Sequence, residues 1–257
     1  MTGDDHALAR HLAGQAGRQL TGLRARGGDP GVLRKAGDRL SHEFLVAALA
    51  ERRPGDVVLS EEGADDPARL GARRVWIVDP LDGTREFGEP GRTDWAVHVA
   101  LWERSDTSDT GDLTAGAVAL PAQGQVLSTA DPPPPLPDDE APAKIRIVVS
   151  RSRPPSFVRN ISGLIDAELI LLGSAGAKVA AVICGEVDAY VHGGGFYEWD
   201  TAAPVAVARA AGLHASRIDG SALAYNQPDL LMPDILVCRP ALAGILLQAI
   251  REVTNAP

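Results

Sequence analysis

The stretch from Val75 to Phe87, VWIVDPLDGTREF, constrains the fold most, because an apolar strand runs directly into a turn of acids. Its first four residues are all apolar, which is typical of a buried strand that ends at Asp79. Pro80 keeps Asp79 out of the helical region of backbone space. Asp82 and then Gly83 follow, and the glycine lets the backbone come close to a phosphate. Two carboxylates on such a turn are a candidate site for a hard divalent cation, which prefers oxygen ligands.

A lone turn of this kind is also typical of a protein surface, because Asp, Pro and Gly are the common turn residues. Further acids at the ends of predicted elements favour the metal site. Glu61 and Glu62 follow an apolar strand at Val57–Leu59, and Asp200 precedes a predicted helix. An Asp before a helix is more often an N-cap than a ligand. Separate acidic positions at several element ends are nevertheless hard to explain as turns and caps alone.

Hydrophobic periodicity predicts a mixed α+β first half and a second half in which strands and helices alternate, so the fold class is α/β. Helices are predicted at Asp5–Arg26, Asp38–Arg53 (with Asp38 as N-cap), Pro155–Ile165, Ala175–Cys184, Asp200–Ala211 and Ala241–Val253. Strands are predicted at Val57–Leu59, Val75–Val78, Trp95–Trp102, Gly116–Leu120, Gln125–Ser128, Ile145–Val149, Leu169–Leu172, Val187–Val191 and Ile235–Cys238. A hairpin turn is predicted at Asp219-Gly220.

A proline-rich acidic segment, PPPPLPDDEAP, is the clearest break in composition. Its prolines favour an extended, semi-rigid conformation and its acids keep it solvated. We therefore predict a linker at residues 132–143, between an N-terminal α+β subdomain (residues 1–131) that carries most of the candidate metal ligands and a C-terminal α/β subdomain (residues 144–257).

Net charge argues against one class of partner. The chain has 25 Lys and Arg against 34 Asp and Glu, a formal net charge of −9, and its basic residues do not cluster apart from acidic ones. Because binding a nucleic-acid polymer normally demands a basic face, we expect no such partner. Small anionic substrates stay compatible with this charge if divalent cations lie between the carboxylates and a phosphate.

The N-terminus begins with an acidic and then helical stretch, unlike a signal peptide, and no segment is long and apolar enough to span a bilayer. Cys184 and Cys238 lie in apolar stretches and are interpreted as small core residues, not as a disulfide or a zinc site. Together these features predict a cytoplasmic protein.

In combination, the acidic motifs resemble a known family. Ser60-Glu61-Glu62, Asp79 to Thr84 and Trp199-Asp200 reproduce the order and approximate spacing of the signature of the inositol-monophosphatase-like superfamily. The stretch Arg85-Glu86-Phe87, the pair Gly173-Ser174 with Lys178, and residues 198–203 are similar to its 3′(2′),5′-bisphosphate nucleotidase branch. The resemblance extends from Asp38 to Cys238.

The resemblance implies a layered α/β/α/β/α sandwich with Mg²⁺, two or three ions per site, at the junction of the two halves. The implied metal ligands are Glu61, Asp79, the backbone carbonyl of Leu81, Asp82 and Asp200. The implied catalytic residues are Glu61 and the pair Asp38–Thr84, which would orient the attacking water and accept its proton. The implied substrate contacts are Asp82, Gly83, Thr84, Ser174, Lys178 and Asp200, those of the second subdomain reaching the nucleotide.

The activity implied by the resemblance is Mg²⁺-dependent hydrolysis of the 3′-phosphate of adenosine 3′,5′-bisphosphate, and of its sulfated relative, by a metal-activated water. It further implies a small phosphorylated nucleotide as partner, a role in sulfate assimilation, and a homodimer as a candidate assembly. Two departures are visible: the stretch around Lys35 is shorter than usual, and the spacing from Ser174 to Lys178 differs by one residue from some nucleotidases.

Two other functions stay open at the level of sequence. A broader sugar phosphatase would act on inositol monophosphate or fructose 1,6-bisphosphate, but Gly193 stands where inositol-specific members carry an acid that contacts sugar hydroxyls. A regulator that binds metal or phosphate without catalysis would be expected to lack at least one of the acids or Thr84. All of them are present, which disfavours that function.

Overall fold

The computed structural model describes residues 4–107, 110–136, 142–152 and 154–254. Its α-helices are α1 (Asp5–Arg24), α2 (Pro30–Arg52), α3 (Thr84–Gly88), α4 (Ser156–Leu164), α5 (Ala175–Ile183), α6 (Glu198–Ala210) and α7 (Ala243–Thr254). Its strands are β1 (Val57–Ser60), β2 (Arg74–Asp82), β3 (Ala96–Arg104), β4 (Gly111–Leu120), β5 (Gln125–Ser128), β6 (Arg146–Ser150), β7 (Glu168–Leu172), β8 (Ala189–His192), β9 (Phe196–Tyr197), β10 (His214–Ser216), β11 (Leu231–Met232) and β12 (Ile235–Cys238).

Two main sheets organise these strands. The first follows chain order, β1-β2-β3-β4-β5, with β1 parallel to β2 and all other pairs antiparallel. The second has the order β10-β12-β8-β6-β7 and is built entirely from the second half of the chain. In it β6 runs parallel to both β7 and β8, while β12 pairs antiparallel with β8 and β10. A short antiparallel pair, β9 with β11, lies outside both sheets.

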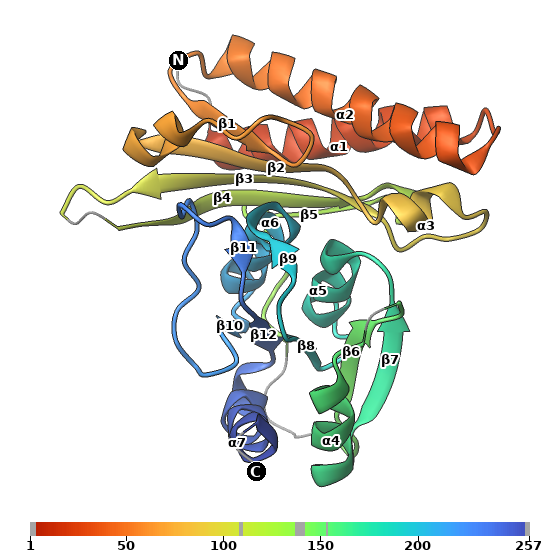
Figure 1. Cartoon of the computed structure of the whole chain (residues 1–257), viewed down its shortest axis with the longest axis vertical. Coiled ribbons are helices and arrows are strands. Elements are labelled where there is room, and N and C mark those ends of the chain that lie inside the picture. The colour runs from red at the N-terminus through yellow and green to blue at the C-terminus, as the bar shows by residue number, and fades with distance from the viewer. Residues whose placement is uncertain (1–3, 108–109, 137–141, 153, 255–257) are drawn as a thin grey trace.

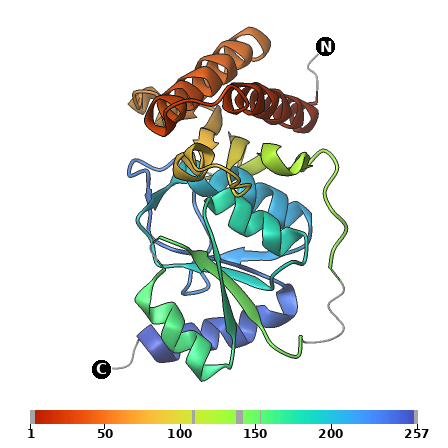
Figure 2. The same cartoon turned by 90° about the vertical axis from the view of Figure 1, so that its right-hand side faces the viewer.

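The helices complete five layers (Figure 1). α1 and α2 cover the outer face of the first sheet, α5 and α6 lie between the two sheets, and α4 and α7 cover the outer face of the second. Figure 2 shows the same stacking from the side, with α4 and α7 crossing beneath the second sheet. The α/β fold class and the α/β/α/β/α sandwich expected from the family resemblance are therefore confirmed.

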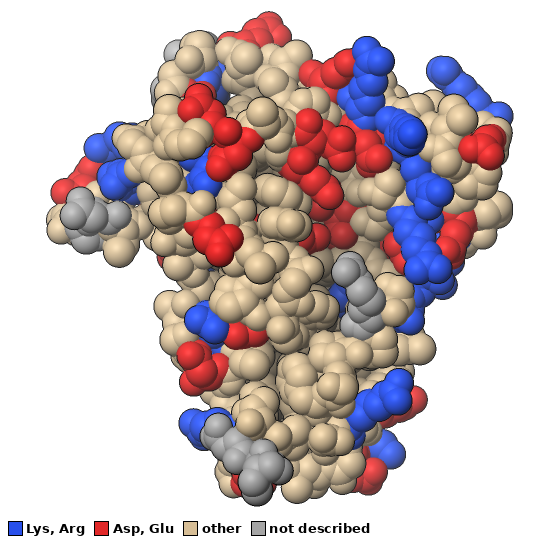
Figure 3. Space-filling view, viewed as in Figure 1, with Lys and Arg blue, Asp and Glu red and all other residues tan. Residues whose placement is uncertain are grey.

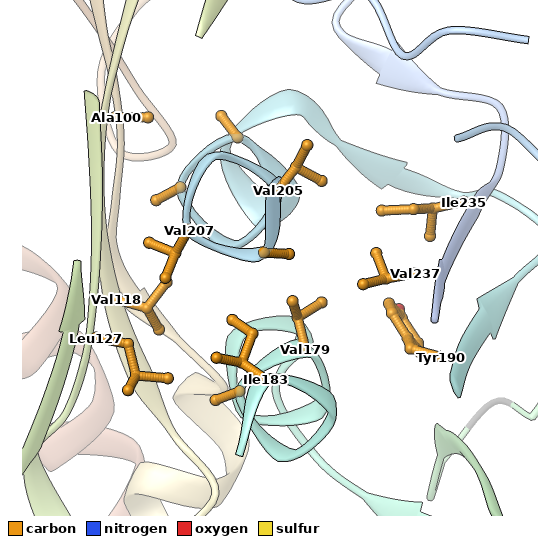
Figure 4. Packing of buried hydrophobic residues seen from close by; sticks show 14 of the residues in the cluster. Ala100, Val118, Leu127, Val179, Ile183, Tyr190, Val205, Val207, Ile235 and Val237 are labelled. Carbon is orange, nitrogen blue, oxygen red and sulfur yellow. The ribbon is translucent and has the colours of Figure 1, made fainter. Parts of the chain in front are cut away.

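The layer between the sheets is an apolar core that fixes α5 and α6 in place. Figure 4 shows Val205 and Val207 of α6 and Val179 of α5 lying between the side chains of the two sheets, with Val118 on one side and Val237 on the other. All five residues are at most 1% exposed. Burying an aliphatic side chain of this size contributes about 1.5–3 kcal/mol. The packing of these side chains therefore holds α5 and α6 firmly between the two sheets.

One helix boundary differs from the sequence prediction. α2 begins at Pro30, eight residues before the predicted N-cap Asp38. The carboxylate of Asp29 accepts hydrogen bonds from the backbone N–H groups of Gly31 and Val32, at 2.9 and 3.0 Å. Asp29 is therefore the N-cap and Pro30 takes the first helical position, where its missing N–H costs nothing. Asp38 lies in the middle of the helix, which leaves its carboxylate available for another contact.

Other predicted elements need smaller corrections. α6 begins at Glu198, so Asp200 lies in its first turn, and its carboxylate accepts a hydrogen bond from the N–H of Tyr197 at 2.6 Å. The turn at Asp219-Gly220 exists, but it does not join two paired strands, because the preceding strand β10 pairs with the distant β12. The strands β9, β10 and β11 are two or three residues long and were too short to predict from periodicity.

The predicted linker is only partly visible. Residues 132–136 form neither helix nor strand and run along one side of the molecule (Figure 2), while residues 137–141 lie outside the described part of the chain. The division into two subdomains at this segment stays a prediction. Of the cysteines, Cys238 is buried as expected but Cys184 is exposed, and the two are not joined by a disulfide. None of the helices in the described ranges has the length and apolarity needed to cross a membrane.

Candidate active site

Three of the predicted acids converge where β2 ends and α6 begins. Asp79 and Asp82 are 1% and 6% exposed, and a register shift in the pairing of β2 with β3 separates them. Asp200 reaches the same point from the first turn of α6. One carboxylate oxygen from each of the three lies within 4.8 Å of the others. Residues far apart in the chain therefore form a single acid cluster, which here means Asp79, Asp82 and Asp200.

Glu61 lies beside this cluster. The parallel register of β1 with β2 places Ser60 opposite Val78, so the next residue of each strand, Glu61 and Asp79, are neighbours as well. Although Glu61 is exposed as a residue, protein atoms surround its carboxyl group, which lies within hydrogen-bonding reach of Asp79. Glu62, its neighbour in sequence, is exposed.

Mutual repulsion among its acids makes the cluster a candidate cation site. Burial and the charges of the neighbouring acids raise the pKa of Asp79 well above its usual range. Burial and the charge of Asp82 raise the pKa of Asp200 to about 6, and burial and the charge of Asp200 raise that of Glu61 to about 7. Acids with raised pKa values take up protons more readily than ordinary carboxyls, and a bound cation would oppose this by favouring their ionised forms. Because the donor set consists of oxygens only, it fits Mg²⁺ better than the softer metals that favour nitrogen or sulfur ligands.

Asp82 behaves differently from the other acids because the N-terminus of α5 holds it. Its Oδ2 accepts hydrogen bonds from the hydroxyl of Ser174 and the N–H of Gly176, both at 2.6 Å. Burial alone would raise its pKa, but the charge and hydrogen bond of His98, the charge of Lys178 and the hydrogen bond of Ser174 outweigh burial and lower the pKa to about 2. Asp82 is therefore a permanently ionised acid in a fixed orientation.

His98 is a residue of this site that sequence reasoning treated only as a packed strand residue. It is fully buried on β3, with Nε2 at 3.2 Å from Oδ2 of Asp82 and Nδ1 at 3.1 Å from the carbonyl oxygen of Trp199. Burial lowers the pKa of His98, but the contact with Asp82 outweighs burial and raises it. Its pairing position directly opposite Asp79 is the signal that could have placed it, had the register of β2 with β3 been known.

A tight fit between α5 and His98 gives a first prediction. A β-carbon at Gly176 would overlap Nε2 of His98, whereas one at Gly22 of α1 would meet no atom within 4 Å. Alanine stabilises a helix interior by about 0.5–1 kcal/mol relative to glycine, while overpacking of a full site costs about 1–3 kcal/mol. We therefore expect Gly176→Ala to lower and Gly22→Ala to raise the free energy of unfolding, measured by urea denaturation. Equal stabilisation by both variants would show that His98 does not fill this space.

The side chains of Asp38 and Thr84 are in contact, although Asp38 lies in the middle of α2. The hydroxyl oxygen of Thr84 lies 3.1 Å from Oδ1 of Asp38 and 2.9 Å from the carbonyl oxygen of Leu81. Burial and the charge of Glu62 raise the pKa of Asp38 to about 6. A hydroxyl that donates to an ionised Asp38 keeps its lone pairs for another donor, and it leaves the carbonyl of Leu81 available as a ligand.

Gly83 connects the cluster to the start of α3 in a conformation that suits glycine. Its φ is +79°, and a β-carbon there would lie 2.9 Å from Cβ of Ser174. The positive φ and the lack of space both exclude a larger residue without local rearrangement. The close approach of Gly83 to Ser174 brings the acidic turn of the first sheet against the start of α5.

The acid cluster opens into a cavity of about 470 Å³. All the predicted substrate-contacting residues line it, namely Asp82, Gly83, Thr84, Ser174, Lys178 and Asp200. Sequence reasoning did not assign other lining residues, among them Ser150, Ser152, Tyr190 and Phe196, because only the folding of the second half brings them here. Arg85, which follows Thr84 in the quoted motif, lines the cavity as well. In Figure 3 acidic side chains gather in the upper middle of the molecule, and a column of Lys and Arg borders them on the right.

Lys178 lines this cavity, and it is buried. Its side chain is 4% exposed, although a lysine on a helix is solvated by default. The ammonium group donates to the carbonyl oxygens of Gly173 and of Ser174, the latter at 2.9 Å, and lies 5.3 Å from the centre of the Tyr190 ring. Burial lowers the pKa of Lys178, and the nearby charges of Asp82 and Asp200 act against burial.

Comparison with protein families and curated proteins gives consistent matches. Residues 12–255 match the model of the inositol monophosphatase family. A protein of Mycobacterium leprae named 3′-phosphoadenosine 5′-phosphate phosphatase is 51% identical over 256 residues, which cover 97% of this chain and 94% of the relative. The 3′(2′),5′-bisphosphate nucleotidase CysQ of Escherichia coli is 33% identical over 206 residues, covering 74% of this chain and 78% of that protein.

Solved structures share the five-layered architecture. The crystal structure of CysQ from Bacteroides thetaiotaomicron, a bacterial member of the inositol monophosphatase family, superimposes with a TM-score of 0.76 at 29% sequence identity. The alignment covers 91% of this chain and 97% of the other. The arrangement of two sheets and three helical layers therefore agrees with a structure known from experiment.

Proposed function

The chain belongs to the inositol monophosphatase family, and we propose that it is a Mg²⁺-dependent phosphatase that removes the 3′-phosphate of adenosine 3′,5′-bisphosphate. The observation that carries the proposal is the convergence of Asp79, Asp82 and Asp200 within 4.8 Å at one end of a cavity that also contains Thr84 and Lys178. The 51% identity to a protein named 3′-phosphoadenosine 5′-phosphate phosphatase supports the substrate.

The residues around the cluster suit hydrolysis of a phosphate monoester. Bound divalent cations would supply neutralisation of the ester oxygens and activation of a water. Asp79, Asp82, Asp200, Glu61 and the carbonyl of Leu81 are the groups that we propose hold two or three Mg²⁺ ions. Gly83 and Lys178 line the cavity beside the cluster. Burial lowers the pKa of Lys178, and the charges of Asp82 and Asp200 act against burial, so we propose that the Lys178 side chain balances negative charge there.

Thr84 and Asp38 form the proposed path for the proton. With its hydroxyl donating to Asp38, the oxygen of Thr84 can accept a hydrogen bond from the attacking water and orient it. Asp38 then receives the proton through Thr84. Because the pKa of Asp38 is raised to about 6, its carboxylate is a stronger base than an ordinary aspartate and is still ionised at neutral pH.

The nucleotide is a better candidate substrate than inositol monophosphate. Gly193 occupies the place where inositol-specific members carry an acid, and a β-carbon there would lie 2.7 Å from Cε1 of Phe157. An acid at this position would therefore require Phe157 to move. A substrate panel tests the choice: kcat/KM for adenosine 3′,5′-bisphosphate should exceed the values for inositol 1-phosphate and fructose 1,6-bisphosphate. A higher value for either sugar phosphate would overturn the nucleotide assignment.

The raised pKa values of the acids predict how stability and Mg²⁺ binding depend on pH. A carboxyl with a raised pKa in the folded state stabilises the fold below its unfolded pKa, and this contribution is lost as the pH rises through the folded pKa. For Glu61 that window runs from its usual value of 4.5 to about 7. Because Mg²⁺ binds the ionised acids, we expect it to raise the Tm more at about pH 8 than at about pH 5.

Thermal unfolding with and without Mg²⁺ across this range measures the effect. Glu61→Gln removes one titrating group, so the difference between the two ends of the range should shrink in that variant. A rise in Tm that is the same at both pH values would contradict the assignment of the acids as ligands. Cytoplasmic location, a role in sulfate assimilation and a homodimeric assembly stay predictions.

A further inference from the structure

A second hollow adjoins the cavity of the acid cluster, and the proposed hydrolysis makes no use of it. This hollow, called the Phe157 pocket below, has a volume of about 300 Å³ and is lined by Pro155, Ser156, Phe157, His192, Gly193, Gly194 and Gly195. His192 and Gly195 also line the larger cavity that contains Asp82 and Asp200. The two spaces therefore share a wall, and a ligand with its phosphate at the acid cluster can extend into the Phe157 pocket.

The aromatic wall of this pocket is held in place. Phe157 lies at the second position of α4, where it packs against the apolar cluster beneath the second sheet while remaining partly exposed. The backbone of Gly193 lies directly against the ring, since a β-carbon there would come within 2.7 Å of Cε1. Figure 1 shows α4 beginning close to the connection between β8 and β9, which contains this glycine. The ring therefore presents a preformed aromatic surface.

The rest of the Phe157 pocket is lined by a turn of three glycines, Gly193 to Gly195, together with His192. Gly194 and Gly195 have φ values of +98° and +81°, and a β-carbon on Gly194 would overlap the carbonyl of Pro233. The N–H of Gly194 donates to Nδ1 of His192 at 3.2 Å, and the His192 ring meets Phe196 edge-on with centroids 5.2 Å apart. Peptide planes and a fixed imidazole ring thus face the Phe157 pocket, and no long side chain of the turn fills it.

These features match one part of the proposed substrate. The phosphates and ribose of a nucleotide are polar and suit the larger cavity, with its acids, hydroxyls and Lys178. The base is planar and aromatic, and bases stack on aromatic side chains with little dependence on their identity. A sugar phosphate has no such group, so it would leave the Phe157 pocket empty and gain nothing from it.

We propose that the Phe157 pocket is the subsite for the heteroaromatic base, and that Phe157 determines the preference for nucleotides over sugar phosphates. The proposal rests on the proposed function, because it assumes that a phosphate of the nucleotide lies at the acid cluster. It assigns to Phe157 a contact with the substrate that does not involve the reacting atoms. Removing the aromatic ring of Phe157 should therefore weaken binding of the nucleotide and leave the chemical step intact.

The test compares two substrates with the Mg²⁺-loaded enzyme. Phe157→Leu keeps an apolar side chain but removes the ring. We expect it to raise KM for adenosine 3′,5′-bisphosphate about 10-fold, the size of one base–aromatic stack, with kcat unchanged. KM for an abasic ribose 3,5-bisphosphate should not change. Phe157→Tyr, which keeps the ring, should behave like the wild type.

Phe44→Leu is the matched control, because Phe44 is also a partly buried phenylalanine. It lies on α2 and packs in the core between α1, α2 and the first sheet, so its substitution should leave KM for both substrates unchanged. Loss of folded protein lowers the apparent kcat but not KM, so a destabilised variant still gives a clear answer. Equal changes in KM for both substrates, no change for the nucleotide, or a defective Phe157→Tyr would each overturn the base subsite. No turnover of adenosine 3′,5′-bisphosphate by the wild type would instead overturn the proposed function itself.

Discussion

Asp82→Asn is expected to lower kcat for phosphate release from adenosine 3′,5′-bisphosphate by about 1000-fold. Residues that only support a metal ligand typically change activity about 10- to 100-fold, and a direct ligand should exceed that range. The substitution removes the acid of the cluster whose pKa is lowered, to about 2. It also turns an amide N–H₂ toward donors, because Oδ2 accepts from the hydroxyl of Ser174 and the N–H of Gly176 while Oδ1 accepts from the N–H of Ala175.

Steady-state kinetics, together with calorimetric titration of Mg²⁺, measures both consequences. Mg²⁺ binding should weaken alongside turnover, while the far-ultraviolet circular dichroism stays that of the folded protein. Asp219→Asn is the matched control, because Asp219 is an exposed aspartate in a turn that bonds only to Ser221 nearby. Turnover by Asp82→Asn within a few-fold of the wild type would remove Asp82 from the metal site.

Thr84→Val is expected to lower kcat about 100- to 1000-fold, with KM nearly unchanged. Valine has the shape of threonine but lacks the hydroxyl that lies 3.1 Å from Oδ1 of Asp38. General acid–base catalysis by a positioned side chain contributes about 100- to 10,000-fold, and losing it acts on the chemical step. The cost in stability is about 1 kcal/mol, the net value of a typical hydrogen bond, which leaves the protein folded.

Thr84→Ser is the informative control, because serine keeps the hydroxyl and loses only the methyl group. Turnover by Thr84→Ser within about 10-fold of the wild type, beside an inactive Thr84→Val, would assign the effect to the hydroxyl. If both variants were equally slow, the methyl packing and not the proton path would explain the loss. If Thr84→Val were as active as the wild type, the Asp38–Thr84 pair would have no part in catalysis.

The acids at element ends were the part of the site that could be predicted from the chain itself. Strand ends in a sheet share an edge, so Glu61 after β1 and Asp79 at the end of β2 were bound to be neighbours once the strands were parallel. Placing Asp200 beside them required the family resemblance, because no local rule says where the start of α6 lies relative to the first sheet. The five layers likewise followed from the resemblance, whereas periodicity alone supported only a mixture of strands and helices.

Long-range packing decided what sequence reasoning could not predict. Asp38 was placed at a helix start because Asp is a common N-cap, but Asp29-Pro30 provides a stronger start signal. Lys178 was expected to contact substrate only through the family resemblance, since a lysine on a helix is solvated by default, and its burial follows from the place of α5 between the two sheets. His98 could not be assigned to the site from the sequence, because Asp82 and Trp199, which it contacts, lie on other elements of the chain.

The cavity walls illustrate the same limit. Phe157 and Gly193 are 36 positions apart in the sequence, and neither carries a motif that marks it as part of a site. Only the folded chain brings the ring of Phe157 against the glycine turn and both beside the acid cluster. The proposed preference for nucleotides therefore rests on packing between α4 and the β8–β9 connection, whereas the acids of the cluster come from β2 and the first turn of α6.

The central claim is that this acid cluster hydrolyses a nucleotide phosphate only when divalent cations occupy it. The most direct measurement is phosphate release from adenosine 3′,5′-bisphosphate by enzyme treated with EDTA and then supplied with increasing Mg²⁺. We expect no release after chelation and full recovery of turnover as Mg²⁺ is restored, with Asp82→Asn inactive throughout. Release that persists in EDTA, or no release at any Mg²⁺ concentration, would contradict the account.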